Sequence, residues 1–107
     1  MNAIRDCSPA AKIIIPTPLF RFQNPDGCDV AEEAFENPNK IGYTQKAYYD
    51  AIFLMSKYLC FDVVDLRTET GFCRQTAPLY QPDNVHPNAE GCEIVAKILY
   101  NHIQLLY

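Results

Sequence analysis

The run "AKIIIPTP", Ala11 to Pro18, is the stretch of sequence that decides the fold class. Its three consecutive isoleucines are β-branched and apolar, and its two prolines end the run, so it predicts a short strand that is apolar on both faces. Strands of this kind lie in sheets that helices cover on both sides. The elements that follow along the chain then determine whether the sheet is parallel.

A helix and a second strand come next. Apolar residues recur at spacings of three and four from about Ile41 to Leu59, which predicts an amphipathic helix there. The residues of this apolar stripe are Ala47, Ala51, Leu54, Met55 and Tyr58. Directly afterwards, "FDVVDL" (Phe61 to Leu66) repeats the pattern of a short buried strand. The order strand, helix, strand implies a parallel pair joined by a crossover helix.

The last predicted helix begins at Asn88, a favoured N-cap residue. Glu90 and Glu93 place negative charge near its N-terminus, where the helix dipole favours it. Its apolar stripe consists of Cys92, Val95, Ala96, Leu99 and Ile103. A further helix is expected to end near Cys7 and lead into the first strand. Strands that alternate with helices predict an α/β fold of three layers, with a parallel sheet between helices.

Two segments have the composition of loops. Leu19 to Lys40 contains turn signals and an acidic patch, with a helical turn expected near Ala31 to Phe35, and Arg67 to Pro82 mixes Thr, Gly, Gln and Pro. The acidic patch, which lacks the ligand spacing of a calcium loop, is interpreted as solvated surface; its residues are Asp29, Glu32, Glu33 and Glu36. Both loops follow the carboxyl end of a predicted strand, so both are expected to line a substrate pocket.

The composition of the 107-residue chain excludes several classes of partner. The net charge is −4, with nine basic and thirteen acidic residues and no basic run, so neither nucleic acid nor an anionic membrane surface is an expected partner. The sequence as given contains no apolar stretch of membrane-spanning length and no export-signal pattern. These features are typical of a soluble globular domain.

The five cysteines form no C-x-x-C pair, so neither a structural zinc site nor a redox dithiol is predicted. Cys60 and Cys92 lie in apolar-periodic stretches and are expected to be small buried residues. Cys28 and Cys73 lie in polar segments, where a thiol is expected to be exposed.

Two buried strands are too few for a sheet of this class. A strand that is apolar on both faces needs neighbouring strands and helices in a number that this sequence does not provide. We therefore expect the chain to be the C-terminal part of a larger domain. Alone, it is expected to self-associate through an exposed sheet edge.

Asp83 and His86 form the candidate catalytic pair. A histidine base needs an acceptor on its Nδ1 proton so that its Nε2 faces the nucleophile, and an aspartate three residues earlier can provide it. Pro87 disfavours helical backbone at His86, which places the imidazole at a rigid helix entrance. The alternative is an ordinary turn that leads into a helix. For Asp65, a structural hydrogen-bond role is favoured over a site role, and His102 is interpreted as a helix-end residue.

The string "D-x-V-H-P-N-x-x-G", from Asp83 to Gly91, resembles the corresponding block of the SGNH (GDSL-type) hydrolases, a family of serine esterases and acylhydrolases. The strands described above precede it as they do in the C-terminal portion of that family. The resemblance implies a flavodoxin-like fold, with Asp83 and His86 as two members of a Ser-His-Asp triad. Asn84 replaces the small residue usual after the aspartate, a mild change because Asn tolerates left-handed backbone.

The chain has no candidate for the third member of the triad. The family's Gly-Asp-Ser and Gly-x-Asn-Asp blocks, which provide the nucleophile and oxyanion donors, do not occur in this sequence. Its two serines, Ser8 and Ser56, lie in a turn and in a predicted helix, where structural roles are expected. The expected function is therefore the C-terminal part of a serine ester hydrolase without a cofactor. Its substrate would be a small ester, with an acylated carbohydrate as one candidate. The alternative is a non-catalytic α/β module that acts as a binding or assembly partner.

Overall fold

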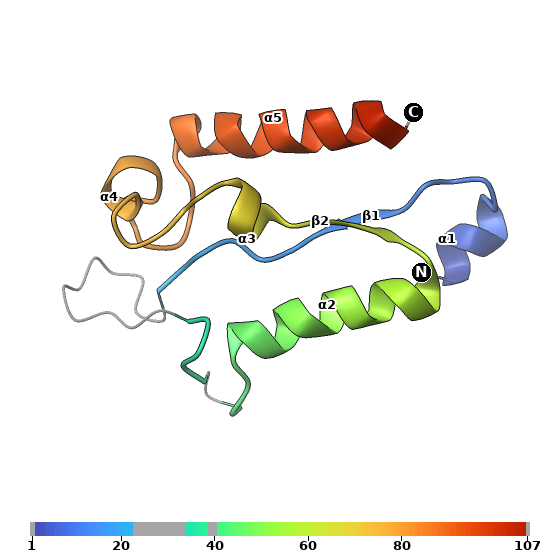
Figure 1. Ribbon diagram of the computed structural model, residues 1–107, viewed down its shortest axis with the longest axis horizontal. Helices are drawn as coiled ribbons and strands as arrows, with labels where there is room; N and C mark the ends of the chain where they lie inside the picture. Colours follow the sequence, from blue (N-terminus) through green and yellow to red (C-terminus); the bar gives the residue numbers. More distant parts are fainter. Residues whose placement is uncertain (1, 23–33, 39–40, 107) are drawn as a thin grey trace.

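The computed structural model describes residues 2–22, 34–38 and 41–106. Two parallel strands lie at its centre, with α2 on one side of them and α5 on the other (Figure 1). The elements in chain order are α1 (Asn2–Cys7), β1 (Ile14–Pro16), α2 (Gln45–Leu59), β2 (Asp62–Val64), α3 (Leu66–Glu69), α4 (Ala77–Tyr80) and α5 (Ala89–Leu106). This arrangement confirms the predicted α/β class with parallel strands and is compatible with part of a flavodoxin-like domain.

The two strands pair in parallel, as the sequence predicts, with Ile15 opposite Val63. Hydrogen bonds at both ends extend the pairing, from Thr17 N to the Val64 carbonyl at 2.9 Å and from Asp62 N to the Ile13 carbonyl at 3.0 Å. Both strands were predicted to be buried on both faces. Of their residues only Val64, which is 1% exposed, is fully buried, whereas the two isoleucines of β1 are half-buried. The described part of the chain thus leaves much of its sheet uncovered.

Helix α2 confirms the predicted helix but begins at Gln45 rather than near Ile41. The Thr44 side chain accepts a hydrogen bond from Ala47 N at 3.1 Å and caps the helix, a start signal that the periodicity alone did not reveal. The predicted apolar stripe also faces solvent, with Leu54 55% and Tyr58 74% exposed. A different side of the helix, with Phe53 half-buried on it, packs toward the sheet. The helix therefore has a second apolar side with no cover among the described residues.

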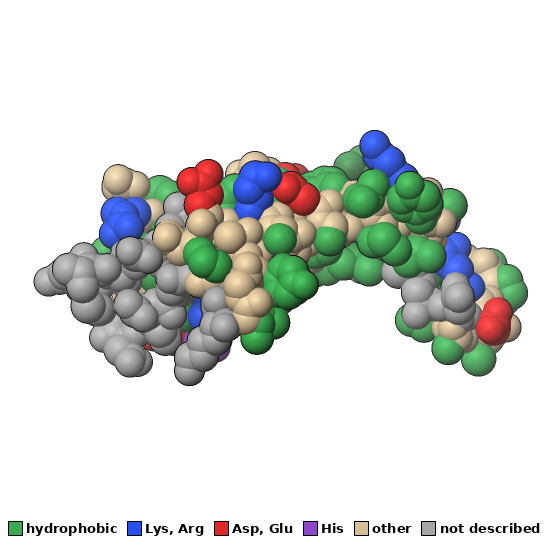
Figure 2. Space-filling view, turned by 90° about the horizontal axis from the view of Figure 1, so that it is seen from below, with side chains coloured by type: hydrophobic (Ala, Val, Ile, Leu, Met, Phe, Trp, Pro, Cys, Tyr) green, Lys and Arg blue, Asp and Glu red, His purple; other side chains and the backbone are tan. Residues whose placement is uncertain are grey.

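Figure 2 views the molecule from the side on which α2 lies in Figure 1. Hydrophobic side chains are exposed over much of this face, and a group of charged side chains lies along its upper edge. The exposed large apolar residues of α2 are Tyr48, Leu54, Met55 and Tyr58. We call these four residues the α2 stripe.

The buried core lies at the carboxyl end of the strands rather than around them. Phe20, Phe22, Phe72 and Ala77 form the cluster, and residues of α4 and α5 pack against it. The rings of Phe20 and Phe22 meet edge to face, with centroids 5.1 Å apart. This core joins the segment after β1 to the helices that flank the Asp83–His86 loop, so it positions the candidate site.

The segment Arg67 to Pro82 is not an irregular loop, because it contains most of α3 and all of α4. Both helices have four residues, too few to produce a recognisable period. The first expected loop, Leu19 to Lys40, lies largely outside the described residues. A turn at 34–36 fits the helical turn expected near Ala31 to Phe35. Residues 31–33 of that expected turn also lie outside the described residues. Of the acidic patch, only Glu36 is described.

The prediction that Cys60 and Cys92 are buried is wrong, since both are exposed. Cys60 follows the last residue of α2 and has left-handed backbone. Cys92 lies on α5, on a side of the helix that α3 and α4 do not cover. Cys73, expected to be exposed, is half-buried, and Cys28 lies outside the described residues. None of the helices in the described part of the chain is long and apolar enough to span a membrane.

Candidate functional site

Asp83 and His86 lie in direct contact in the loop between α4 and α5. The Oδ2 of Asp83 is 2.5 Å from Nδ1 of His86. The other carboxylate oxygen, Oδ1, accepts the backbone N–H groups of Val85 at 2.9 Å and His86 at 2.6 Å. An ionised carboxylate can only accept, so Nδ1 carries the proton and Nε2 of the neutral imidazole has the free lone pair. This is the tautomer that a general base requires.

These contacts also determine the charge state of Asp83. The hydrogen bond from the His86 side chain, together with the two backbone N–H groups, lowers the pKa of Asp83 from 3.8 to about 2. Because the pKa is lowered in the folded state, the contribution to stability is complete above the unfolded pKa near 4 and is lost as the pH falls through about 2. The carboxylate is therefore fully ionised at neutral pH.

The residues around the pair define the backbone of the loop. Asn84 adopts left-handed backbone with φ of 66°, a conformation that asparagine tolerates better than most residues. Asn88 begins α5: its Oδ1 accepts from Gly91 N at 2.9 Å, and its Nδ2 donates to the Leu79 carbonyl at 2.7 Å. It thereby caps one helix and ties it to the preceding one. The predicted N-cap role of Asn88 is confirmed.

Gly91 lies in the first turn of α5, against the last residue of α4. A Cβ at this position would lie 2.9 Å from the Tyr80 carbonyl oxygen and 2.9 Å from Cβ of Pro87. The first neighbour is a backbone atom of α4 and the second belongs to a proline ring, so neither can turn away as the end of a long side chain could. Only glycine permits this approach.

We expect Gly91→Ala to destabilise the protein by about 1–2 kcal/mol, since overpacking of a tight contact typically costs 1–3 kcal/mol. An ordinary helical glycine behaves in the opposite way and gains up to about 1 kcal/mol on replacement by alanine. Denaturant unfolding measures the difference, with Ala96→Gly on the exposed side of α5 as the control for helix propensity. An increase in stability for Gly91→Ala would contradict the close contact.

The imidazole of His86 is accessible from outside. Its side chain is 81% exposed, and among the described residues its Nε2 has no hydrogen-bond partner. The carboxyl ends of β1 and β2 point toward the end of the molecule where α4 and the start of α5 lie (Figure 1). Parallel α/β sheets bind ligands at this end.

Neither serine of the chain can serve this histidine. Ser8 follows α1, which lies at the opposite end of the molecule from α4 (Figure 1). The hydroxyl of Ser56 donates to the Phe53 carbonyl at 2.6 Å within α2. Both serines have the structural roles expected of them.

Asp65 stabilises the fold rather than the candidate site, which agrees with the favoured interpretation. Its carboxylate accepts from the Tyr49 hydroxyl at 2.6 Å, from Thr17 at 3.3 Å and from Thr68 N at 3.3 Å. Burial works to raise the pKa of Asp65, but these hydrogen bonds outweigh it and the pKa is lowered. Burial and the bond to Asp65 raise the pKa of Tyr49 to about 12. The cluster joins β1, α2 and α3.

His102 has a partner that the sequence did not indicate. Its Nε2 lies 2.9 Å from a carboxylate oxygen of Glu69, which joins α5 to α3. The two residues are 33 positions apart, and no local pattern predicts such a pair. His102 lies near the end of α5, as expected, and the contact adds a link from that end to α3.

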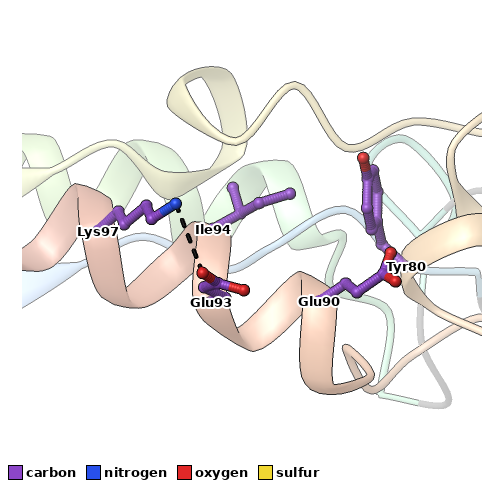
Figure 3. A pocket seen from close by; sticks show the side chains of 5 residues that line it. All are labelled: Tyr80, Glu90, Glu93, Ile94 and Lys97. Carbon is purple, nitrogen blue, oxygen red and sulfur yellow. Dashed lines mark ion pairs between the residues drawn. The ribbon is translucent and has the colours of Figure 1, made fainter.

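An open depression of about 360 Å³ lies beside α5 and is lined by Tyr80, Glu90, Glu93, Ile94 and Lys97 (Figure 3). Lys97 pairs with Glu93 at 3.5 Å. Neither Asp83 nor His86 lines it, so it is separate from the candidate site. Among the described residues no group of three His, Cys, Asp or Glu side chains is arranged to hold a metal ion.

Comparison with known proteins identifies the fold. No protein-family model matches the chain, and no curated protein matches it. One solved structure has 26% sequence identity and a TM-score of 0.77, and the match covers 97% of this chain and 48% of that one. A Lactobacillus plantarum protein has 19% identity and a TM-score of 0.77, with 99% and 50% covered. The esterase domain of the ORF1 protein from the zebrafish ZfL2-1 retrotransposon has 18% identity and a TM-score of 0.66, with 96% and 55% covered.

The chain thus spans about half the length of the solved structures that it matches. It shares its fold with part of an esterase domain, which agrees with the resemblance of its sequence to the C-terminal portion of the SGNH hydrolases.

Proposed function

We propose that this chain, which has the fold of about half of an esterase domain, provides the acid–base residues of a serine esterase of the SGNH type. The observation that carries the proposal is the contact between Asp83 and His86. It fixes the imidazole tautomer and leaves Nε2 open to the outside. The complete domain would be a three-layer, flavodoxin-like structure in which this chain forms the C-terminal part.

The chemistry of the proposed reaction is acyl transfer. Nε2 of His86 takes the proton of a serine hydroxyl as the serine oxygen attacks the ester carbonyl. The tetrahedral intermediate then expels the alcohol, which receives the proton from His86, and leaves an acyl-serine. Water, activated by the same imidazole, releases the acid and restores the serine. Asp83 holds the imidazole throughout and stabilises its protonated form.

The serine and the oxyanion donors would come from a segment outside this chain. Two observations support this: neither serine present lies where His86 could reach its hydroxyl, and the matched structures are about twice as long. The large exposure of His86 fits a site that another segment completes. No cofactor is needed for the reaction.

The substrate would be a small ester, and an acylated carbohydrate is one candidate. The described residues that directly follow β1 and β2 lie at the end of the sheet where α4 and the start of α5 lie, so they are the candidates for the pocket wall (Figure 1). Self-association of the chain through its sheet edge remains a separate proposal.

A non-catalytic binding module is the second candidate function, and the exposed α2 stripe favours it. The coding sequence upstream of Met1 distinguishes the two. An in-frame Gly-Asp-Ser block supports the esterase, whereas a stop codon directly upstream supports the module.

For the 107-residue chain alone we expect no hydrolysis of an O-acetylated sugar above the buffer rate, because it has no activated serine. An alkyl ester is the suitable substrate, since free imidazole hydrolyses activated aryl esters by itself. Turnover should appear once in-frame upstream residues are included, and should disappear with His86→Ala. Turnover by the chain alone that His86→Ala abolishes would mean a nucleophile within the chain, with Cys73 first to test.

A further inference from the structure

Gln81 is a fully buried polar residue directly after α4, with 0% of its surface exposed. Its side-chain Nε2 donates to the Phe20 carbonyl at 2.6 Å and to the Val85 carbonyl at 3.3 Å. Its backbone carbonyl accepts from Asn84 N at 2.8 Å. One residue thus joins the segment after β1 to the loop that carries His86.

The peptide group between Val85 and His86 is held at both ends. Its N–H donates to Asp83 Oδ1 at 2.6 Å, and its carbonyl oxygen accepts from Gln81. The preceding peptide is held in the same way, because its N–H donates to Asp83 Oδ1 and its carbonyl accepts from Phe22 N at 3.1 Å. The plane of a peptide determines the direction of the next Cα–Cβ bond. The position of the imidazole therefore depends on Gln81 as well as on Asp83.

The amide of Gln81 can face only one way. Two carbonyl oxygens lie on its nitrogen side, and a reversed amide would place its own oxygen against both. In the observed orientation Oε1 is buried and has no partner among the described residues. A buried acceptor without a donor costs stability, so an apolar side chain would suit this position better if packing were its only role.

We infer that Gln81 is a positioning residue for His86: its carboxamide fixes the Val85–His86 peptide so that the imidazole meets Asp83 and presents Nε2 outward. The catalytic value of positioning His86 depends on the proposed function, whereas the hydrogen bonds of Gln81 are observed independently of it. Sequence reasoning missed Gln81 because no local pattern marks a glutamine whose partners lie 61 residues earlier and four residues later.

Gln81→Met tests the inference, because methionine has a similar length and no donor. We expect the carboxyl group of Asp83, followed by NMR, to titrate about one pH unit higher than the wild-type value of about 2, since a looser loop weakens its bonds to His86. Gln45→Met is the matched control: it removes an amide that donates to the neighbouring Leu19 carbonyl at 2.7 Å, and it should leave the titration unchanged. An unchanged midpoint in Gln81→Met overturns the inference.

If Gln81→Met does not fold, the wild-type protein decides the question. The carboxamide protons of Gln81 should exchange with solvent far more slowly than those of the exposed Gln75, and equally fast exchange overturns the inference. In an active esterase, Gln81→Met should lower kcat about a hundredfold with little change in KM, as a misplaced catalytic group does. A wild-type protein without esterase activity contradicts the proposed function and leaves the NMR results to decide the role of Gln81.

Discussion

Asp83→Asn is expected to lower kcat for ester hydrolysis about ten-thousand-fold in the complete esterase domain, the loss found for the equivalent change in a serine protease triad. The asparagine oxygen can still accept the two backbone N–H groups that Asp83 Oδ1 accepts. Its amide nitrogen, however, would face Nδ1 of His86 and donate to it. The imidazole then carries its proton on Nε2, where the base needs a lone pair.

This prediction separates catalysis from folding. Asp83 is exposed, and an asparagine keeps the two backbone hydrogen bonds, so at neutral pH Asp83→Asn should lower folding stability far less than it lowers activity; only the contribution of the ionised carboxylate beside His86 is lost. The measurements are steady-state kinetics and denaturant unfolding of the same protein. Asp62→Asn, at an exposed aspartate of β2, is the control and should keep full activity. Equal activity of Asp83→Asn and the wild type would remove Asp83 from the triad.

The features that the sequence predicted correctly are those that local chemistry determines. Asn88 begins α5 because its side chain can cap the helix. The contact between Asp83 and His86 spans three residues, so the spacing sufficed to place the two side chains together. The parallel strands followed from their apolar runs and the helix between them.

The features that the sequence did not predict depend on distant contacts. Gln81 and His102 have partners 61 and 33 residues away, and no periodicity encodes these separations. The short helices α3 and α4 lack the length to show a period. The prediction that Cys60 and Cys92 are buried failed for a related reason. An apolar position is buried only where another element covers it, and none of the described residues covers these two.

The same lack of cover determines how the isolated chain should behave. Among the residues that the structure describes, the sheet has two strands of three residues each, both with a free edge, and the apolar side chains of the α2 stripe face solvent. A helix that is apolar on two sides is typical of the interior of a larger protein. Unpaired strand edges offer hydrogen-bonding groups to any similar edge.

We therefore expect the purified 107-residue chain to self-associate through its sheet edge and the α2 stripe, or to remain loosely folded. Burial of about 400 Å² of apolar surface is worth about 10 kcal/mol at about 25 cal/mol per Å², which equals the whole stability of a small domain. The mass in solution and amide hydrogen exchange in β1 and β2 measure the outcome. Leu54→Lys and Tyr58→Lys should weaken association, because each buries a charge in the contact, whereas Lys57→Ala, at an exposed polar position between them, should not. A strictly monomeric chain with strongly protected strand amides would mean that the described elements close their own core, and the argument for an absent covering segment would fail.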